Sequence, residues 1–70
     1  MKIFNFLFPE KPYLANIHTK EVHDTRNLTK RCSVNLMADH NKKYLTERAF
    51  RKALKKGYNG CTHCLKKYDS

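Results

Sequence analysis

The sequence has no long apolar run, few acidic residues and an odd number of cysteines. A membrane-spanning helix needs roughly 20 consecutive apolar residues, whereas the apolar stretch at 3–8 is short and contains Asn5. That stretch continues into Pro9 and Glu10 without a small-residue cleavage site, so it does not resemble a secretory signal. We therefore expect a cytoplasmic protein without a transmembrane segment.

The cysteine count of 3 excludes a complete set of intramolecular disulfides, because one thiol would be left over. A chain of 70 residues also buries little apolar surface, and domains of this size commonly need a disulfide or a metal ion for stability. Three thiolates and one imidazole around a single metal ion would use every cysteine. The sequence therefore predicts one small metal-stabilised domain in a reducing compartment.

The most informative motif is Cys61-Thr62-His63-Cys64, because two thiolates at this spacing bind one metal ion from a single tight turn. Backbone amides of such a turn can donate to the sulfurs and offset their charge. We predict one Zn²⁺ per chain, held by a set of three cysteines and one histidine: His23, Cys32, Cys61 and Cys64. His18 competes with His23, since alternation along a strand would let only one of the two face the metal.

Other chemistry of the two-cysteine motif fits less well. A thioredoxin-like site needs a βαβ context that this chain is too short to supply. Covalent haem attachment needs a histidine directly after the second cysteine, where Leu65 stands. A [2Fe–2S] cluster with three cysteines and one histidine, or free thiols without metal, stay as alternatives.

Residues 47–56 are predicted to form the main helix. Thr46 is a suitable N-cap, Glu47 places negative charge at the helix N-terminus, and Gly57 can adopt the left-handed conformation that ends a helix. At helical periodicity the apolar side chains share one face, formed by Ala49, Phe50, Ala53 and Leu54. Basic side chains occupy the opposite face, formed by Arg48, Arg51, Lys52, Lys55 and Lys56.

The other expected elements are short. Residues 15–22 read as one strand that delivers His23 at its end, and residues 42–45 read as a second strand. Residues 33–40 offer a turn of helix or an irregular hydrophobic plug, and Gly60 gives the backbone room for the turn before Cys61. The fold class is therefore α+β: a small zinc-stabilised domain with two or three short strands and one main helix before the two-cysteine turn.

Two regions are expected along the chain. Residues 1–15 form an aromatic N-terminal extension, and residues 16–70 form the zinc-binding domain. The extension either packs back over a domain that is short of core or serves as a docking peptide for a partner protein or a membrane interface.

Positive charge is concentrated in the second half of the chain. Lys and Arg number 15 against 6 acidic residues, and residues 42–70 carry 9 of the former and 2 of the latter. Such a field attracts phosphate backbones, anionic membranes or acidic proteins without choosing among them, and a solvated lysine-rich surface is the alternative. The candidate nucleic-acid-binding residues are Lys42, Lys43, Arg48, Arg51, Lys52, Lys55, Lys56, Lys66 and Lys67.

The order of these motifs resembles the zinc-binding domain of Ada-type methylphosphotriester repair proteins and the stand-alone Ada-like zinc modules of phages and bacteria. The matching text is Glu21-Val22-His23, Cys32, the run 43–53 and Gly57-Tyr58-Asn59-Gly60-Cys61-Thr62-His63-Cys64. The resemblance implies a compact α+β domain around one structural zinc. It also favours His23 over His18 as the fourth ligand.

One departure from the family's pattern bears on function. The resemblance implies, for Ada-type repair, the transfer of a methyl group to a zinc-bound thiolate of the first ligand pair. In this chain the first ligand is His23, and its imidazole cannot replace that nucleophile. Cys32 is then the one candidate acceptor. We therefore predict a non-enzymatic zinc module that binds nucleic acid and takes no small-molecule substrate. Docking into a larger assembly through the aromatic N-terminus is the alternative, and methyl-accepting repair is a more distant one.

Overall fold

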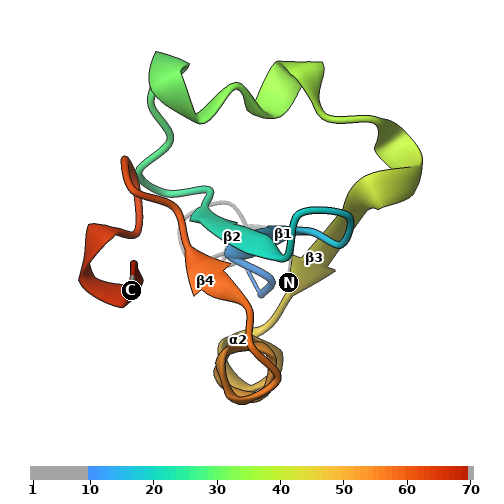
Figure 1. Ribbon diagram of the computed structural model, residues 1–70, viewed down its shortest axis with the longest axis vertical. Helices are drawn as coiled ribbons and strands as arrows, with labels where there is room; N and C mark the ends of the chain where they lie inside the picture. The colour runs from blue at the N-terminus through green and yellow to red at the C-terminus, as the bar shows by residue number, and fades with distance from the viewer. Residues whose placement is uncertain (1–9, 70) are drawn as a thin grey trace.

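The computed structural model describes residues 10–69 (Figure 1). Within this range four short strands form one mixed sheet in the order β3-β1-β2-β4. The strands are β1 (Tyr13–Asn16), β2 (Glu21–Asp24), β3 (Lys42–Leu45) and β4 (Asn59–Gly60), and the α-helix is α2 (Glu47–Lys55). Short 3-10 turns complete the described chain: η1 (Lys30–Cys32), η2 (Val34–Leu36), η3 (Asp39–Asn41) and η4 (Lys66–Tyr68). The predicted α+β class is confirmed.

Strands β1 and β2 form an antiparallel hairpin. The prediction of one strand over 15–22 is wrong, because the chain turns back directly after Asn16. The Asn16 Oδ1 atom accepts hydrogen bonds from the amides of His18 at 2.9 Å and Thr19 at 3.2 Å. Lys20 completes the turn in the left-handed region, with φ 60°. His23 is therefore delivered by the second strand of a hairpin.

Strand β1 is an inner strand, paired with β2 on one side and with β3 on the other. Tyr13, Leu14 and Ala15, which sequence analysis assigned to the N-terminal extension, are buried in the sheet. The aromatic residues at 3–8, which carry the docking-peptide hypothesis, lie outside the described residues. The folded domain therefore includes residues from position 13 onward.

The two faces of the sheet have different roles. Because side chains alternate along a strand, Tyr13, Ala15 and Val22 face one side, whereas Leu14 and its partner His23 face the other. The Tyr13 ring stacks on Phe50 of α2, with ring centroids 4.0 Å apart. Figure 1 shows α2 on one side of the sheet and the segment 25–41 arching over the other. His23 therefore points away from the helix.

Helix α2 begins and ends as its sequence predicts. The Thr46 side chain accepts a hydrogen bond from the amide of Ala49 at 3.1 Å, and Gly57 follows the C-cap with φ 97°. The helix buries Phe50 and Ala53, whereas its basic side chains are exposed. The predicted helix at 47–56 is thus confirmed except at Lys56, which is the C-cap. Among residues 10–69, no helix has the length and apolar character needed to cross a bilayer.

The segment between β2 and β3 is irregular and contains three of the 3-10 turns. Cys32 is buried at the end of η1, and Val34 packs against the core. Leu36 is 79% exposed, so the segment is not a hydrophobic plug. Its contribution to the fold is the position of Cys32.

Strand β4 pairs in parallel with β2, with Val22 opposite Gly60. The amide of Cys61 then donates to the carbonyl of Val22 at 2.8 Å. A Cβ atom on Gly60 would lie 2.6 Å from the Leu65 carbonyl oxygen and 2.7 Å from Tyr68 Cβ. The absence of a side chain at this position lets the C-terminal segment fold back against the sheet, with Cys61 held at its edge.

Candidate metal centre

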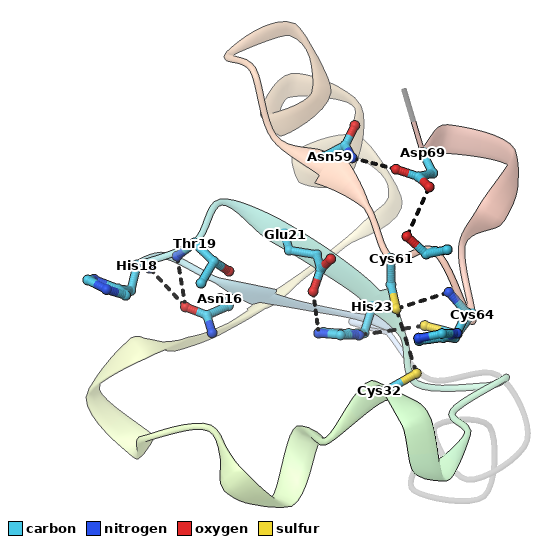
Figure 2. A network of polar contacts seen from close by, with 12 residues as sticks. Asn16, His18, Thr19, Glu21, His23, Cys32, Asn59, Cys61, Cys64 and Asp69 are labelled. Atoms are coloured by element: carbon cyan, nitrogen blue, oxygen red, sulfur yellow. Dashed lines mark hydrogen bonds and ion pairs between the residues drawn. The ribbon is translucent and has the colours of Figure 1, made fainter.

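Four potential metal ligands converge from separate parts of the chain (Figure 2). They are His23 in β2, Cys32 at the end of η1, and Cys61 and Cys64 after β4. Their ligand atoms all lie within 4.8 Å of one another. These are the four residues that the sequence predicts as ligands, and the structure brings all of them together in an arrangement that could hold a metal ion.

The spacing within this cluster fits a single tetrahedral ion. With metal–sulfur bonds of about 2.3 Å and metal–nitrogen bonds of about 2.0 Å, tetrahedral geometry separates two sulfurs by about 3.8 Å and a sulfur from a nitrogen by about 3.5 Å. The Sγ atoms of Cys32 and Cys61 are 3.8 Å apart, and Cys64 Sγ lies 3.7 Å from His23 Nδ1. A disulfide would need about 2.05 Å between sulfurs, and all three cysteines are free.

Each sulfur also has a hydrogen-bonding neighbour that can offset thiolate charge. The amide of His63 donates to Cys61 Sγ at 3.3 Å, as predicted for the two-cysteine turn. The amide of Asp24 in β2 donates to Cys64 Sγ at 3.3 Å. The Thr29 hydroxyl lies 3.5 Å from Cys32 Sγ. Such donors stabilise the anionic ligands of a metal site.

The protonation behaviour of the cluster suits metal binding. Burial lowers the pKa of His23, which keeps the imidazole neutral and its lone pair free at neutral pH. Burial raises the pKa of the Cys64 thiol to about 12. At Cys32 burial acts in the same direction, but hydrogen bonds with Thr29, Cys64 and Cys61 together outweigh it and lower the pKa of that thiol. A divalent cation bound to the cluster would displace the proton of the Cys64 thiol.

Glu21 is a site residue that sequence analysis missed. Its Oε1 atom lies 3.6 Å from Nε2 of His23, on the side of the ring away from the sulfurs. Two residues apart on one strand share a face, so the Glu-x-His spacing within a strand was the available signal. Asp24 and Thr29 were also missed, and their contacts with the cluster depend on tertiary structure that no local pattern shows.

The other histidines lie outside the cluster. His18, His40 and His63 are exposed. Figure 2 shows His18 at the hairpin turn, pointing away from the cysteines. His63 is exposed in the two-cysteine turn, as expected, and its amide donates to Cys61 Sγ.

The candidate nucleic-acid-binding residues lie on several elements. Lys42 and Lys43 are on β3, Lys66 and Lys67 are in η4, Lys56 is the C-cap of α2, and the other members are on α2. All are exposed except Lys42, which is half-buried.

Comparison of the chain with protein-family models, with curated proteins and with solved structures found no match. The resemblance to Ada-like zinc modules therefore stays a prediction from sequence motifs.

Proposed function

We propose that this chain is a small zinc module in which one Zn²⁺, bound by His23, Cys32, Cys61 and Cys64, stabilises the fold. The supporting observation is that the four ligand atoms lie within 4.8 Å of one another. Three thiolates and one imidazole in tetrahedral arrangement are donors that zinc prefers. A [2Fe–2S] cluster divides its ligands between two irons, which would place some ligand atoms farther apart than this cluster allows.

The same geometry favours a structural ion over a catalytic one. Four protein ligands complete a tetrahedral shell, whereas catalytic zinc keeps a position open for water or substrate. Cys32, the one candidate for methyl acceptance, is 8% exposed, and Cys61 is 2% exposed. These features support a non-enzymatic role.

The finer part of the proposal is that the exposed face of α2 binds nucleic acid. Arg48, Lys52 and Lys55 make no ion pair within residues 10–69, whereas Arg51 pairs with Glu47 at 3.2 Å. Unpaired cations on one surface can neutralise phosphates and release counterions. The formal net charge of +9 gives this surface a long-range attraction for polyanions.

Metal content tests the first part of the proposal. Elemental analysis and native mass spectrometry of protein purified without added metal should show one zinc per chain. His23→Ala and Cys64→Ser should lose zinc and unfold, because metal-binding energy is folding energy in a domain of this kind. His18→Ala and His63→Ala are matched controls that should retain both. A folded protein without metal, or one with two irons per chain, would refute the zinc assignment.

Salt dependence tests the second part. Affinity for a nucleic-acid duplex or single strand should fall steeply as salt rises, because each phosphate contact adds to the slope of log affinity against log salt. Lys52→Gln should reduce that slope, whereas Lys30→Gln, an exposed position in η1, should not. An affinity that is indifferent to salt would exclude phosphate contacts by α2.

A further inference from the structure

A hollow of about 190 Å³ lies between β3 and α2, and lysine side chains line it from both elements. Lys43 comes from β3, Lys52 comes from the exposed face of α2, and Lys56 follows as the helix C-cap. None of the three forms an ion pair with any described residue. No acidic residue of the range 10–69 lines the hollow. The hollow therefore presents three uncompensated positive charges.

The rest of the lining is apolar or aromatic. Leu45, Ala49 and Ala53 contribute aliphatic surface, and Tyr58 contributes an aromatic ring. Leu45 and Ala53 are buried parts of the core, and Ala49 and Tyr58 pack against that core. The hollow thus has a fixed apolar floor, while its charged groups are flexible lysines.

We propose that this hollow receives one unstacked base of a single-stranded nucleic acid, with Lys43, Lys52 and Lys56 binding the adjacent phosphates. A nucleotide joins a flat, largely apolar base to a charged phosphate within one unit, which matches an apolar floor beside cations. Proteins that bind single strands combine the same two features, a basic groove and an aromatic platform. The inference rests on the proposed nucleic-acid binding by α2 and names the form of nucleic acid and the place where it binds.

The chemistry of the hollow distinguishes this ligand from others. A duplex keeps its bases stacked inside and offers phosphates alone, so it would gain nothing from the apolar floor. An acidic peptide carries its charges and its apolar groups on different side chains, and it would not need an aromatic wall. A second hollow on the other flank of α2, lined by Phe50, Arg51, Leu54, Lys55 and Tyr68, is less suitable. One of its two cations, Arg51, already pairs with Glu47.

The test compares zinc-loaded variants by fluorescence anisotropy. The probes are a single-stranded oligothymidine of about 12 nucleotides, within the usual site size of such proteins, and the matching duplex. Ala49→Leu fills the floor without changing charge, and Ala38→Leu adds the same side chain at an exposed position outside the hollow. Lys43→Gln removes one cation from the rim, with Lys30→Gln as its charge-matched control. Circular dichroism and zinc content establish that each variant is folded.

Ala49→Leu should weaken single-strand binding by at least about fivefold, the lower end of the effect of losing one stacked base, and leave duplex binding unchanged. Lys43→Gln should lower the slope of log affinity against log salt for the single strand by about 0.7. If Ala49→Leu fails to fold, this change in slope is the test of the inference. If both probes bind and neither variant changes their affinity or salt slope, the base-binding role of the hollow is refuted, while the proposed nucleic-acid binding stands. Binding of neither probe would overturn both. Binding of an acidic, leucine-containing peptide in place of the oligonucleotides, blocked by Ala49→Leu, would identify a peptide site and refute the inference.

Discussion

Glu21 and His23 lie on the same face of β2, with Glu21 Oε1 3.6 Å from His23 Nε2. The opposite ring nitrogen, Nδ1, lies 3.7 Å from the Sγ atom of Cys64. A carboxylate beside Nε2 favours the tautomer that carries its proton there, which leaves the Nδ1 lone pair for a metal ion. Glu21 is 41% exposed while His23 is 2% exposed. A surface carboxylate thus lies where it can orient a buried candidate ligand.

Replacement of Glu21 by alanine should therefore weaken zinc binding. Loss of an outer-shell partner of this kind typically costs about 10- to 100-fold in metal affinity, and we expect the lower end because Glu21 is partly solvated. Competition with a chromophoric chelator measures the change. Glu10→Ala, which removes the same charge at an exposed position, should leave the affinity unaltered. Equal affinities of the two variants would show that Glu21 does not orient the imidazole.

Gly60→Ala should destabilise the zinc-bound domain more than Gly57→Ala. At Gly60 a Cβ atom would meet backbone and Cβ atoms at 2.6 and 2.7 Å, whereas at Gly57 nothing lies within 4 Å. The overpacking should cost about 3 kcal/mol, and the positive φ at Gly57 should cost about 1 kcal/mol when alanine replaces glycine. Chemical denaturation of the zinc-bound variants compares the two. A larger loss at Gly57 would contradict the close approach of the C-terminal segment to β4.

The parts of the fold that sequence analysis predicted correctly are those determined by local chemistry. The limits of α2 follow from the Thr46 cap and from Gly57, and its buried face follows from the spacing of Phe50 and Ala53. Strand β3 has the predicted bounds. The candidate ligands were also accessible from sequence. The cysteines stood out because cysteine is scarce in this chain and the spacing of Cys61 and Cys64 is specific to a tight turn, whereas His23 was favoured over His18 by the resemblance to Ada-like zinc modules.

The errors have two sources, a turn with a weak local signal and contacts between segments far apart in the chain. The hairpin turn depends on the Asn16 side chain, which accepts from two amides, and its Asn-x-x-x-Lys sequence is a weak signal on its own. The stacking of Tyr13 on Phe50 joins residues far apart in the chain. Without that contact, Tyr13 reads as part of an aromatic N-terminal extension. The parallel pairing of β2 with β4 joins equally distant segments, and no periodicity predicts it.

Tyr13→Phe should destabilise the domain while preserving its ring stacking. The Tyr13 hydroxyl donates to Glu47 at 2.9 Å and accepts from Arg26 at 3.2 Å. The Arg26 guanidinium also donates two hydrogen bonds to Asp24, which is buried. Removal of the hydroxyl should cost about 1 kcal/mol, the usual net value of a hydrogen bond, as measured by thermal unfolding. Tyr44→Phe is the matched control, since Tyr44 is 52% exposed, and an equal effect there would argue against the network.

Zinc affinity should rise with pH because metal binding displaces thiol protons. In the folded domain burial raises the pKa of the Cys64 thiol to about 12, so this thiol is protonated at neutral pH unless a metal ion binds it. Zinc binds the thiolate and displaces this proton, so Cys64 alone should make the zinc affinity increase about tenfold per pH unit. Because the pKa of His23 is lowered, protons compete with the metal ion for its imidazole only in more acidic solution. The metal-dependent stability of the domain therefore decreases as pH falls.

Chelator competition between about pH 6 and pH 8 measures this slope. Cys64→His keeps four ligands but replaces a thiol that must lose a proton with an imidazole that is already neutral through most of this range. For this variant, the slope of log zinc affinity against pH should be lower by about one than for the unaltered chain. His18→Ala, an exposed histidine outside the cluster, should leave the slope unchanged. An equal slope for Cys64→His and the unaltered chain would mean that Cys64 contributes no thiolate to the metal, and the three-cysteine, one-histidine assignment would then be wrong at that position.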